Sequence, residues 1–185
     1  MRIIAGQWRG RRLKALSGRQ TRPTLDRVKE ALFDMIGPYF SGGLTLDAFA
    51  GSGALGLEAL SRGKERAVFI ERDPRAAAVL WENIRALGAE SRAVVVVHDA
   101  VRAAGRLVRR GVAADLVFFD PPYEFPDSAL VELLGVYAAA GVFRSEAVIC
   151  VERGGPFMGP SDARFQLWKA RSFGTAHVVI FRYRG

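Results

Sequence analysis

The chain has 185 residues, half of them hydrophobic and a quarter charged, which is the composition of a globular domain with a full core. No apolar stretch is long enough to span a membrane, no apolar signal region opens the chain, and the single cysteine, Cys150, excludes an internal disulfide, so we expect a cytoplasmic protein. The net charge is +8: residues 1–30 carry nine basic and two acidic side chains, whereas residues 31–185 carry eighteen and seventeen. A basic segment on a nearly neutral body indicates binding to a polyanion, most simply a nucleic acid.

The first elements form this basic segment. Residues 2–8 and 11–16 are predicted as two short strands around Arg9-Gly10, which would make a basic β-hairpin. A polar connection follows, and apolar residues at helical spacing predict a helix over residues 24–36 that Gly37-Pro38 ends. We therefore divide the chain into a basic arm, residues 1–20, and a main domain, residues 21–185.

Strand and helix patterns alternate through most of the main domain. Strands are predicted over residues 44–49, 67–70, 93–97, 116–119 and 147–151, and helices over residues 53–62, 73–88, 101–110 and 128–140. The last two strands, 165–170 and 177–183, flank a turn and predict an antiparallel hairpin. This alternation predicts an α/β fold: a Rossmann-like, largely parallel sheet covered by helices on both faces.

A glycine-rich turn joins the first predicted strand to the next helix. Gly51 and Gly53 allow the backbone to approach a ligand closely, and the helix that follows offers free N–H groups. With Gly56 they match the dinucleotide fingerprint, and Glu71, at the end of the next strand, stands where a ribose-binding carboxylate belongs. These residues alone do not separate a nicotinamide or flavin enzyme from an S-adenosylmethionine enzyme.

Carboxylates at the ends of other strands favour S-adenosylmethionine. Asp47 would repel a pyrophosphate but tolerates a zwitterionic amino acid that carries a sulfonium, and Asp99 could accept a hydrogen bond from an adenine amino group. Asp120 ends the fourth strand, beside the crevice where ligands of such sheets bind. Asp73, next to a proline, is interpreted as a helix cap.

The segment Asp120-Pro121-Pro122-Tyr123 is the most informative in the chain. Two successive prolines form a stiff elbow, because each fixes its own φ and lacks an N–H group. The elbow presents a carboxylate, a carbonyl outside strand pairing and an aromatic ring. These groups suit a planar heteroaromatic amine, whose two N–H bonds need two acceptors and whose ring can stack.

These motifs resemble the bacterial small-subunit ribosomal RNA guanine-N2-methyltransferases, the RsmD-like group. The resemblance covers essentially the whole chain, from Met1-Arg2-Ile3-Ile4-Ala5-Gly6 through Thr21-Arg22-Pro23-Thr24 and the glycine turn to the diproline elbow. It implies a seven-stranded methyltransferase sheet, S-adenosylmethionine as methyl donor with S-adenosylhomocysteine as product, and the N2 amine of a guanine in 16S rRNA as acceptor. Ala5 and Ala48 depart mildly from the family pattern, in which serine and leucine are common.

The resemblance and the motifs together assign site residues. Catalysis is assigned to the elbow, Asp120, Pro121, Pro122 and Tyr123. Cofactor binding is assigned to residues that follow strand ends or precede the first helix: Arg22, Thr24, Asp47, Phe49, Gly51, Ser52, Gly53, Glu71, Arg72, Asp99 and Ala100. RNA binding is assigned to the basic residues of the arm and the first helix: Arg2, Arg9, Arg11, Arg12, Lys14, Arg19 and Arg27. We expect no metal, a monomer, and 16S rRNA within a small-subunit assembly particle as partner.

Three other functions stay open from the sequence. The elbow motif does not identify which base is methylated, so the acceptor could be an adenine in DNA or a base in another RNA. The glycine pattern also fits an NAD-dependent oxidoreductase. A non-catalytic RNA-binding factor could keep the same fold, because a fold does not fix a function.

Overall fold

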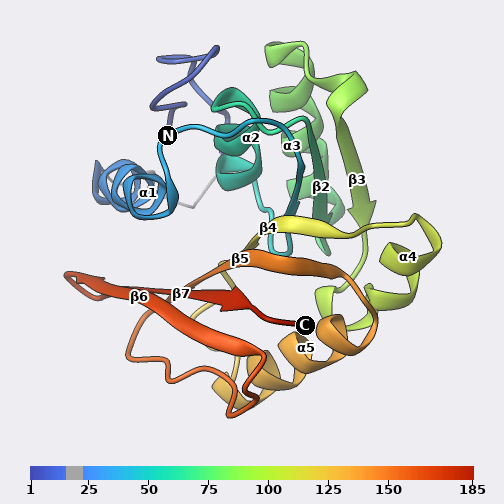
Figure 1. The fold of residues 1–185 in the computed structure, drawn as a ribbon. Coiled ribbons are helices and arrows are strands. Elements are labelled where there is room, and N and C mark those ends of the chain that lie inside the picture. Colours follow the sequence, from blue (N-terminus) through green and yellow to red (C-terminus); the bar gives the residue numbers. More distant parts are fainter. Residues whose placement is uncertain (16–22) are drawn as a thin grey trace.

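A single twisted sheet of seven strands organises the chain (Figure 1). The computed structural model describes the backbone of residues 1–15 and 23–185, and side chains over residues 1–15 and 26–185. The strand order is β3-β2-β1-β4-β5-β7-β6; β1 to β5 pair in parallel, and β7 joins β5 and β6 in antiparallel fashion. The strands are β1 Leu44–Asp47, β2 Arg66–Glu71, β3 Ala93–Val97, β4 Ala114–Phe119, β5 Phe143–Arg153, β6 Phe165–Phe173 and β7 Ala176–Tyr183.

Helices cover both faces of this sheet, as the alternating pattern predicts (Figure 1). One face packs against α1 to α3 and the other against α4 and α5. Strand residues divide accordingly: Phe69 and Phe118 enter the α1–α3 side, whereas Val117 and Phe119 enter the α4–α5 side. The helices are α1 Pro23–Ile36, α2 Ala54–Ser61, α3 Pro74–Leu87, α4 Ala104–Arg109 and α5 Asp127–Ala139, with 3₁₀ turns η1 Glu90–Arg92 and η2 Ala100–Arg102.

Element boundaries differ from the sequence prediction mainly at β5. The prediction covers residues 147–151, but the strand runs from Phe143 to Arg153 because β7 pairs with it up to Arg153. The prediction was too short because charged residues near both ends of β5 interrupt its apolar pattern. The first strand is shorter than predicted, since β1 ends at Asp47 and the turn begins at Ala48. The predicted helix 101–110 is divided into η2 and α4.

The predicted N-terminal hairpin is only partly correct. The segment does pair in antiparallel fashion, through an isolated bridge between Arg2 and Arg12 and a hydrogen bond from Ile3 N to Arg11 O (2.9 Å). However, no strand forms within residues 1–15, so the prediction of two strands was wrong there. The intervening backbone turns and bonds to α2 instead of to a partner strand; Gln7 N, for example, donates to Ser61 O (2.9 Å). The predicted domain boundary at residue 20 lies outside the described residues and stays a prediction.

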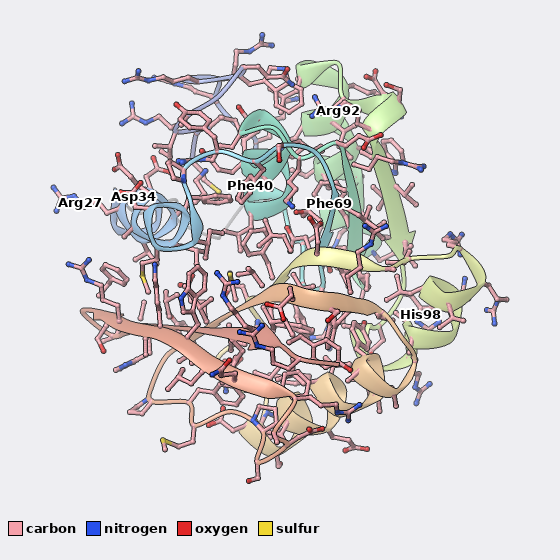
Figure 2. The ribbon with its side chains drawn as sticks, viewed as in Figure 1. Arg27, Asp34, Phe40, Phe69, Arg92 and His98 are labelled. Carbon is pink, nitrogen blue, oxygen red and sulfur yellow. The ribbon has the colours of Figure 1, made fainter. Side chains whose placement is uncertain are left out.

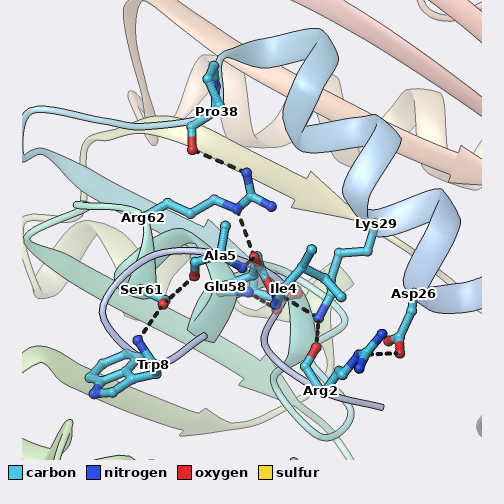
Figure 3. A network of polar contacts seen from close by, with 12 residues as sticks. Arg2, Ile4, Ala5, Trp8, Asp26, Lys29, Pro38, Glu58, Ser61 and Arg62 are labelled. Atoms are coloured by element: carbon cyan, nitrogen blue, oxygen red, sulfur yellow. Dashed lines mark hydrogen bonds and ion pairs between the residues drawn. The ribbon is translucent and has the colours of Figure 1, made fainter. Parts of the chain in front are cut away.

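A buried carboxylate fixes the arm to the main domain (Figure 3). Glu58 of α2 is fully buried and accepts hydrogen bonds from the backbone N–H groups of Ile4 (2.9 Å) and Ala5 (3.0 Å). It also forms ion pairs with Arg62 (2.7 Å) and with Lys29 of α1 (3.1 Å), and burial lowers the pKa of Lys29 although Glu58 opposes this shift. One carboxylate therefore joins the arm, α1 and α2.

Replacing Glu58 with Gln should lower the free energy of unfolding by about 3–5 kcal/mol, because the cations of Lys29 and Arg62 would stay buried without a counter-charge. Urea unfolding at neutral pH measures the change. Glu82→Gln is the control: it breaks the exposed pair between Glu82 and Lys14, and should cost less than about 1 kcal/mol. Equal losses in the two variants would contradict a stabilising role for the Glu58 network.

Candidate active site at the carboxyl edge of the sheet

The parallel strands bring five carboxyl groups to one edge of the sheet. Asp47, Glu71 and Glu152 lie within the last residues of β1, β2 and β5, and Asp120 and Asp99 follow β4 and β3. Four of these are the strand-end residues predicted from the sequence; Glu152 was missed, although it ends the predicted fifth strand in the same way. In this topology the carboxyl edge is where ligands bind.

Neighbouring residues fix the backbone conformation of the glycine turn. Gly51 and Gly53 have φ values of 53° and 84°, in the left-handed region, and a Cβ on Gly53 would lie 2.3 Å from the Leu80 side chain. Gly51 N donates to Glu71 Oε2 (2.8 Å), and the Asn83 side chain donates to Ser52 O (2.9 Å). Asn83, which the sequence reasoning missed, therefore fixes the turn from α3.

Glu71 is half-buried, and both oxygens of its carboxylate accept hydrogen bonds from backbone N–H groups. Besides Gly51 N, it accepts a hydrogen bond from Asp73 N (2.8 Å). Each carboxylate oxygen keeps a further lone pair, so a vicinal diol can still donate to this group. Asp73 caps α3 by accepting from Arg75 N (2.9 Å), which confirms its predicted role. Arg72 is exposed.

Asp99 lies at the start of η2. Its carboxylate accepts a hydrogen bond from Val101 N (2.9 Å), and the residue is half-buried. Ala100 is buried, and its carbonyl accepts a hydrogen bond from the Tyr137 hydroxyl (2.7 Å). The adjoining backbone is thereby tied to α5. His98, labelled in Figure 2, donates its backbone N–H to Glu71 O (3.0 Å), and its ring Nδ1 lies 3.1 Å from the Asp99 carbonyl oxygen.

Asp47 lies deeper than the other four carboxyls. It is buried and accepts a hydrogen bond from Gly56 N (3.0 Å), near the N-terminus of α2. Burial raises its pKa to about 7, and the charges of Asp120 and Glu71 add to this rise, whereas the bond from Gly56 opposes it. A pyrophosphate at the start of α2 would face this carboxylate, so the turn is poorly suited to a dinucleotide.

Arg153 fixes the diproline elbow from β5. Its guanidinium donates to the carbonyls of Phe125 (2.6 Å) and Pro122 (3.4 Å) and pairs with Asp127 (2.9 Å). Sequence reasoning missed this residue, because nothing in its local pattern shows that β5 ends against the elbow.

The elbow presents the three groups that the sequence predicts. Asp120 is exposed, Pro121 is buried, and the Pro121 carbonyl accepts no hydrogen bond within the described residues. The Tyr123 ring is 71% exposed and lies over Gly154, where an added Cβ would be 2.4 Å from the ring. Gly154 therefore permits the position of this ring.

Phe49 connects the elbow to the glycine turn. Its ring centroid lies 5.3 Å from that of Phe125 and 6.4 Å from that of Phe119. The structure thus places the elbow beside the turn that follows β1, as a shared site requires. The ring packs against the core cluster that contains Phe119, so Phe49 anchors the turn after β1 to the core.

The described basic residues assigned to RNA binding, on the arm and on α1, differ in their surroundings. Arg2, Arg9 and Arg27 line a hollow of about 470 Å³ between the arm and α1, together with Asp26 and Glu30. Figure 2 shows Arg27 on the outer side of α1. Two others anchor the arm to α3: Arg11 donates to Ala86 O (2.5 Å), and Lys14 pairs with Glu82 (2.7 Å). Arg12 is exposed.

Three predicted residues lie outside this description. Arg19 and Arg22 fall between the described ranges, and the side chain of Thr24 is likewise outside the described residues. Within residues 1–15 and 23–185, each helix is too short or too polar to cross a bilayer. No three His, Cys, Asp or Glu side chains of that part gather in a manner that could hold a metal ion.

The strand order and the site define the class of fold: a Rossmann-like sheet of the S-adenosylmethionine-dependent methyltransferases, which confirms the predicted fold. The solved structure titled "Putative methyltransferase yhhF from Escherichia coli" superposes with a TM-score of 0.84 at 36% identity, over 100% of this chain and 98% of that one.

Sequence relatives give the family. The Bacillus subtilis protein named "Putative rRNA methyltransferase YlbH" is 39% identical over 186 residues, which cover 100% of both chains. The Haemophilus influenzae "Ribosomal RNA small subunit methyltransferase D" is 42% identical over 184 residues, 98% of this chain and 92% of that protein. A family model described as conserved hypothetical protein 95 matches residues 1–182. The chain belongs to this family, the RsmD-like group that the motifs predict.

Replacing Asp47 with Asn should make the protein progressively more stable than the wild type as the pH rises from about 4 to 7. The native carboxyl titrates near 7 and the unfolded one near 3.8, so unfolding releases a proton in this window and wild-type stability falls by roughly 4 kcal/mol. Asparagine avoids this loss and can still accept from Gly56 N. Urea unfolding at several pH values measures the difference between the two proteins.

Asp73→Asn is the control with the opposite sign. Arg75 lowers the pKa of Asp73, so the ionised carboxylate stabilises the fold above its unfolded pKa, and this variant should be less stable than the wild type at neutral pH but not in acid. A constant difference between Asp47→Asn and wild type at all pH values would contradict the assigned titration.

Proposed function

We propose that the protein transfers a methyl group from S-adenosylmethionine to the exocyclic N2 amine of a guanine in 16S ribosomal RNA. The observation that carries the proposal is the position of the diproline elbow beside the glycine turn, joined by the contact of Phe49 with Phe125. The names of the relatives, small-subunit rRNA methyltransferases, support rRNA as the substrate. The fold class supports the cofactor.

The residues of the carboxyl edge fit the cofactor. The left-handed backbone at Gly51 and Gly53 leaves the turn without side chains that would block a ligand, and Glu71 keeps lone pairs for the ribose hydroxyls. Asp99 is assigned to the adenine amine. When bound, S-adenosylmethionine supplies an electrophilic methyl group on a sulfonium, and S-adenosylhomocysteine remains.

Other cofactor contacts are assigned by position. Asp47 is the last residue of β1, and Ser52 lies in the turn that follows it. Phe49 supports this turn, and Arg72 and Ala100 follow Glu71 and Asp99, the carboxyls assigned to the ribose and to the adenine. Arg22, which precedes α1 in the sequence, and Thr24, the second residue of α1, are proposed to close over the cofactor, as the resemblance implies.

The elbow would hold the acceptor amine. The Asp120 carboxylate and the Pro121 carbonyl would each accept one of its hydrogens, which orients the nitrogen lone pair along the transfer axis. Positioning of this kind lowers a barrier by up to about 7–11 kcal/mol. Asp120 would then take the proton from the methylated nitrogen, and Tyr123 would stack on the base, a contact worth roughly 1–3 kcal/mol. A stacked base cannot enter this site, so we expect a flipped or looped-out nucleotide.

The alternatives have less support. For a nicotinamide enzyme, Asp47 occupies the N–H group at the start of α2 that would meet a pyrophosphate. A non-catalytic RNA-binding protein would not need, on one elbow, a carboxylate, an exposed ring and a carbonyl to which no described residue donates. Adenine methylation in DNA or another RNA remains the second candidate, because the elbow accepts any planar amine.

The test is methyl transfer from labelled S-adenosylmethionine to small ribosomal subunits that lack the modification, followed by mass analysis of the nucleosides. The proposal predicts N2-methylguanosine in 16S rRNA. A product on adenine, or no transfer to either naked 16S rRNA or assembling particles, would contradict it. Comparing the rates on naked 16S rRNA and on assembling particles also identifies the preferred partner. The molar mass of the protein from light scattering tests the expected monomer.

Asp120→Asn should reduce the rate of methyl transfer at least about 100-fold, because the amide is a far weaker proton acceptor than the carboxylate. Calorimetric binding of S-adenosylhomocysteine should change only a few-fold. Glu124→Gln changes an exposed carboxyl that follows the elbow in the chain and has no assigned role; it is the control and should keep full activity. Undiminished turnover by Asp120→Asn would remove Asp120 from the mechanism.

The double variant Arg9→Gln/Arg27→Gln should weaken RNA binding and flatten its salt dependence, because two phosphate contacts at the arm hollow would be lost. Each contact contributes about 0.7–0.9 to the slope of log K against log salt. Deleting the arm would be a poorer test, since Ile3 and Leu13 are part of the core.

Arg106→Gln/Arg109→Gln on α4 is the matched control for charge and should leave the slope unchanged. If both double variants flattened the slope equally, the effect would be one of net charge and the arm would have no particular role.

A further inference from the structure

Glu152 is a carboxyl of the site that the proposed mechanism does not use. It lies on β5, and the pairing of Phe119 with Val151 places the next residues of the two strands, Asp120 and Glu152, side by side. Glu152 pairs across β7 with Val178, whose side chain lies in the cluster on the α1 side of the sheet. Asp47 pairs with Phe118 on that same side. Asp120 and Glu152 thus lie side by side, on the same face of the sheet as Asp47, which is level with Phe118, two residues before Asp120.

Nothing within the described residues compensates the charge of Glu152. Its half-buried carboxyl makes no hydrogen bond or ion pair there, and the adjacent Arg153 is committed to the elbow. Burial, and to a lesser degree the charge of Asp120, raise the pKa of Glu152 to about 8. A partly buried carboxyl without a partner destabilises a fold, so a purely structural role would be served better by an uncharged side chain.

The pattern of donors on guanine matches two adjacent carboxylates. On its pairing edge, the N2 amine lies beside the N1–H group, so the two neighbouring groups are both donors. Adenine instead presents its amine beside N1, a lone-pair acceptor, which would oppose a second carboxylate. Neighbouring parallel strands are about 4.8 Å apart, and the extra methylene of Glu152 lets its carboxylate reach past Asp120 toward the ring.

We propose that Glu152 is the specificity-determining residue of the acceptor site: its carboxylate accepts the guanine N1–H while Asp120 accepts the adjacent amine. This inference rests on the proposed function, and it explains how a diproline elbow that accepts any planar amine selects guanine. Binding of two donors also relieves the repulsion between the two carboxyls, because each carboxyl then faces a hydrogen that carries a partial positive charge.

The test uses 2-aminopurine, which keeps the amine but lacks O6 and has a lone pair in place of N1–H; the comparison with Glu152→Gln separates the effect at N1 from that of O6. The 2-aminopurine is introduced into 16S rRNA at the nucleotide that the wild-type protein methylates. The wild type should transfer a methyl group to 2-aminopurine at least about 100-fold more slowly than to guanine, since a buried acceptor would lose its donor and face a lone pair. Glu152→Gln offers both an amide N–H and a carbonyl, and should reduce this preference at least tenfold.

The control variant Glu124→Gln should keep the wild-type ratio of rates, and thermal unfolding should show that Glu152→Gln is folded. Equal ratios for wild type and Glu152→Gln, or a wild type that prefers 2-aminopurine because a protonated Glu152 donates to N1, would overturn the role of Glu152 alone. A wild type that methylates no guanine in any particle would overturn the proposed function and this inference together.

Discussion

The parallel pairing of β1 to β5 is the constraint on which the rest of the structure depends. Because these strands end at one edge, turns and carboxyls that are far apart in the chain meet there. The arrangement has an electrostatic cost: burial and, to a lesser degree, the charge of Asp120 raise the pKa values of Asp47 and Glu152. A ligand that brings N–H donors lowers that cost, so the edge suits the proposed guanine, with its N2 amine and its N1–H group, better than it suits an anion.

Helix α2 connects the two halves of the proposed function. Its first turn follows the glycine turn, and there Gly56 N donates a hydrogen bond to the Asp47 carboxyl. Its second half carries Glu58 and Ser61, whose side chains accept hydrogen bonds from backbone N–H groups of the arm. The arm that is proposed to bind RNA and the turn proposed to bind the cofactor are therefore built on opposite ends of one short helix. Truncation of the arm would disturb both.

The sequence predicted the order of elements and most of the edge, because glycine turns, prolines and strand-end carboxylates are local signals. It failed where the partner is distant. The Asp120–Glu152 pair arises from strand register, and Arg153 from the meeting of β5 with the elbow. The predicted strands of the arm failed for the same reason, since the backbone bonds to Ser61 instead. Glu152 alone could have been found, by applying the strand-end rule once more.

A crystal structure of the protein with S-adenosylhomocysteine and an RNA that contains the target nucleotide would test the account most directly. We expect a flipped guanine whose N2 lies within hydrogen-bonding distance of both Asp120 and the Pro121 carbonyl, with the cofactor sulfur facing that nitrogen. A guanine bound elsewhere, or a cofactor away from the glycine turn, would contradict it.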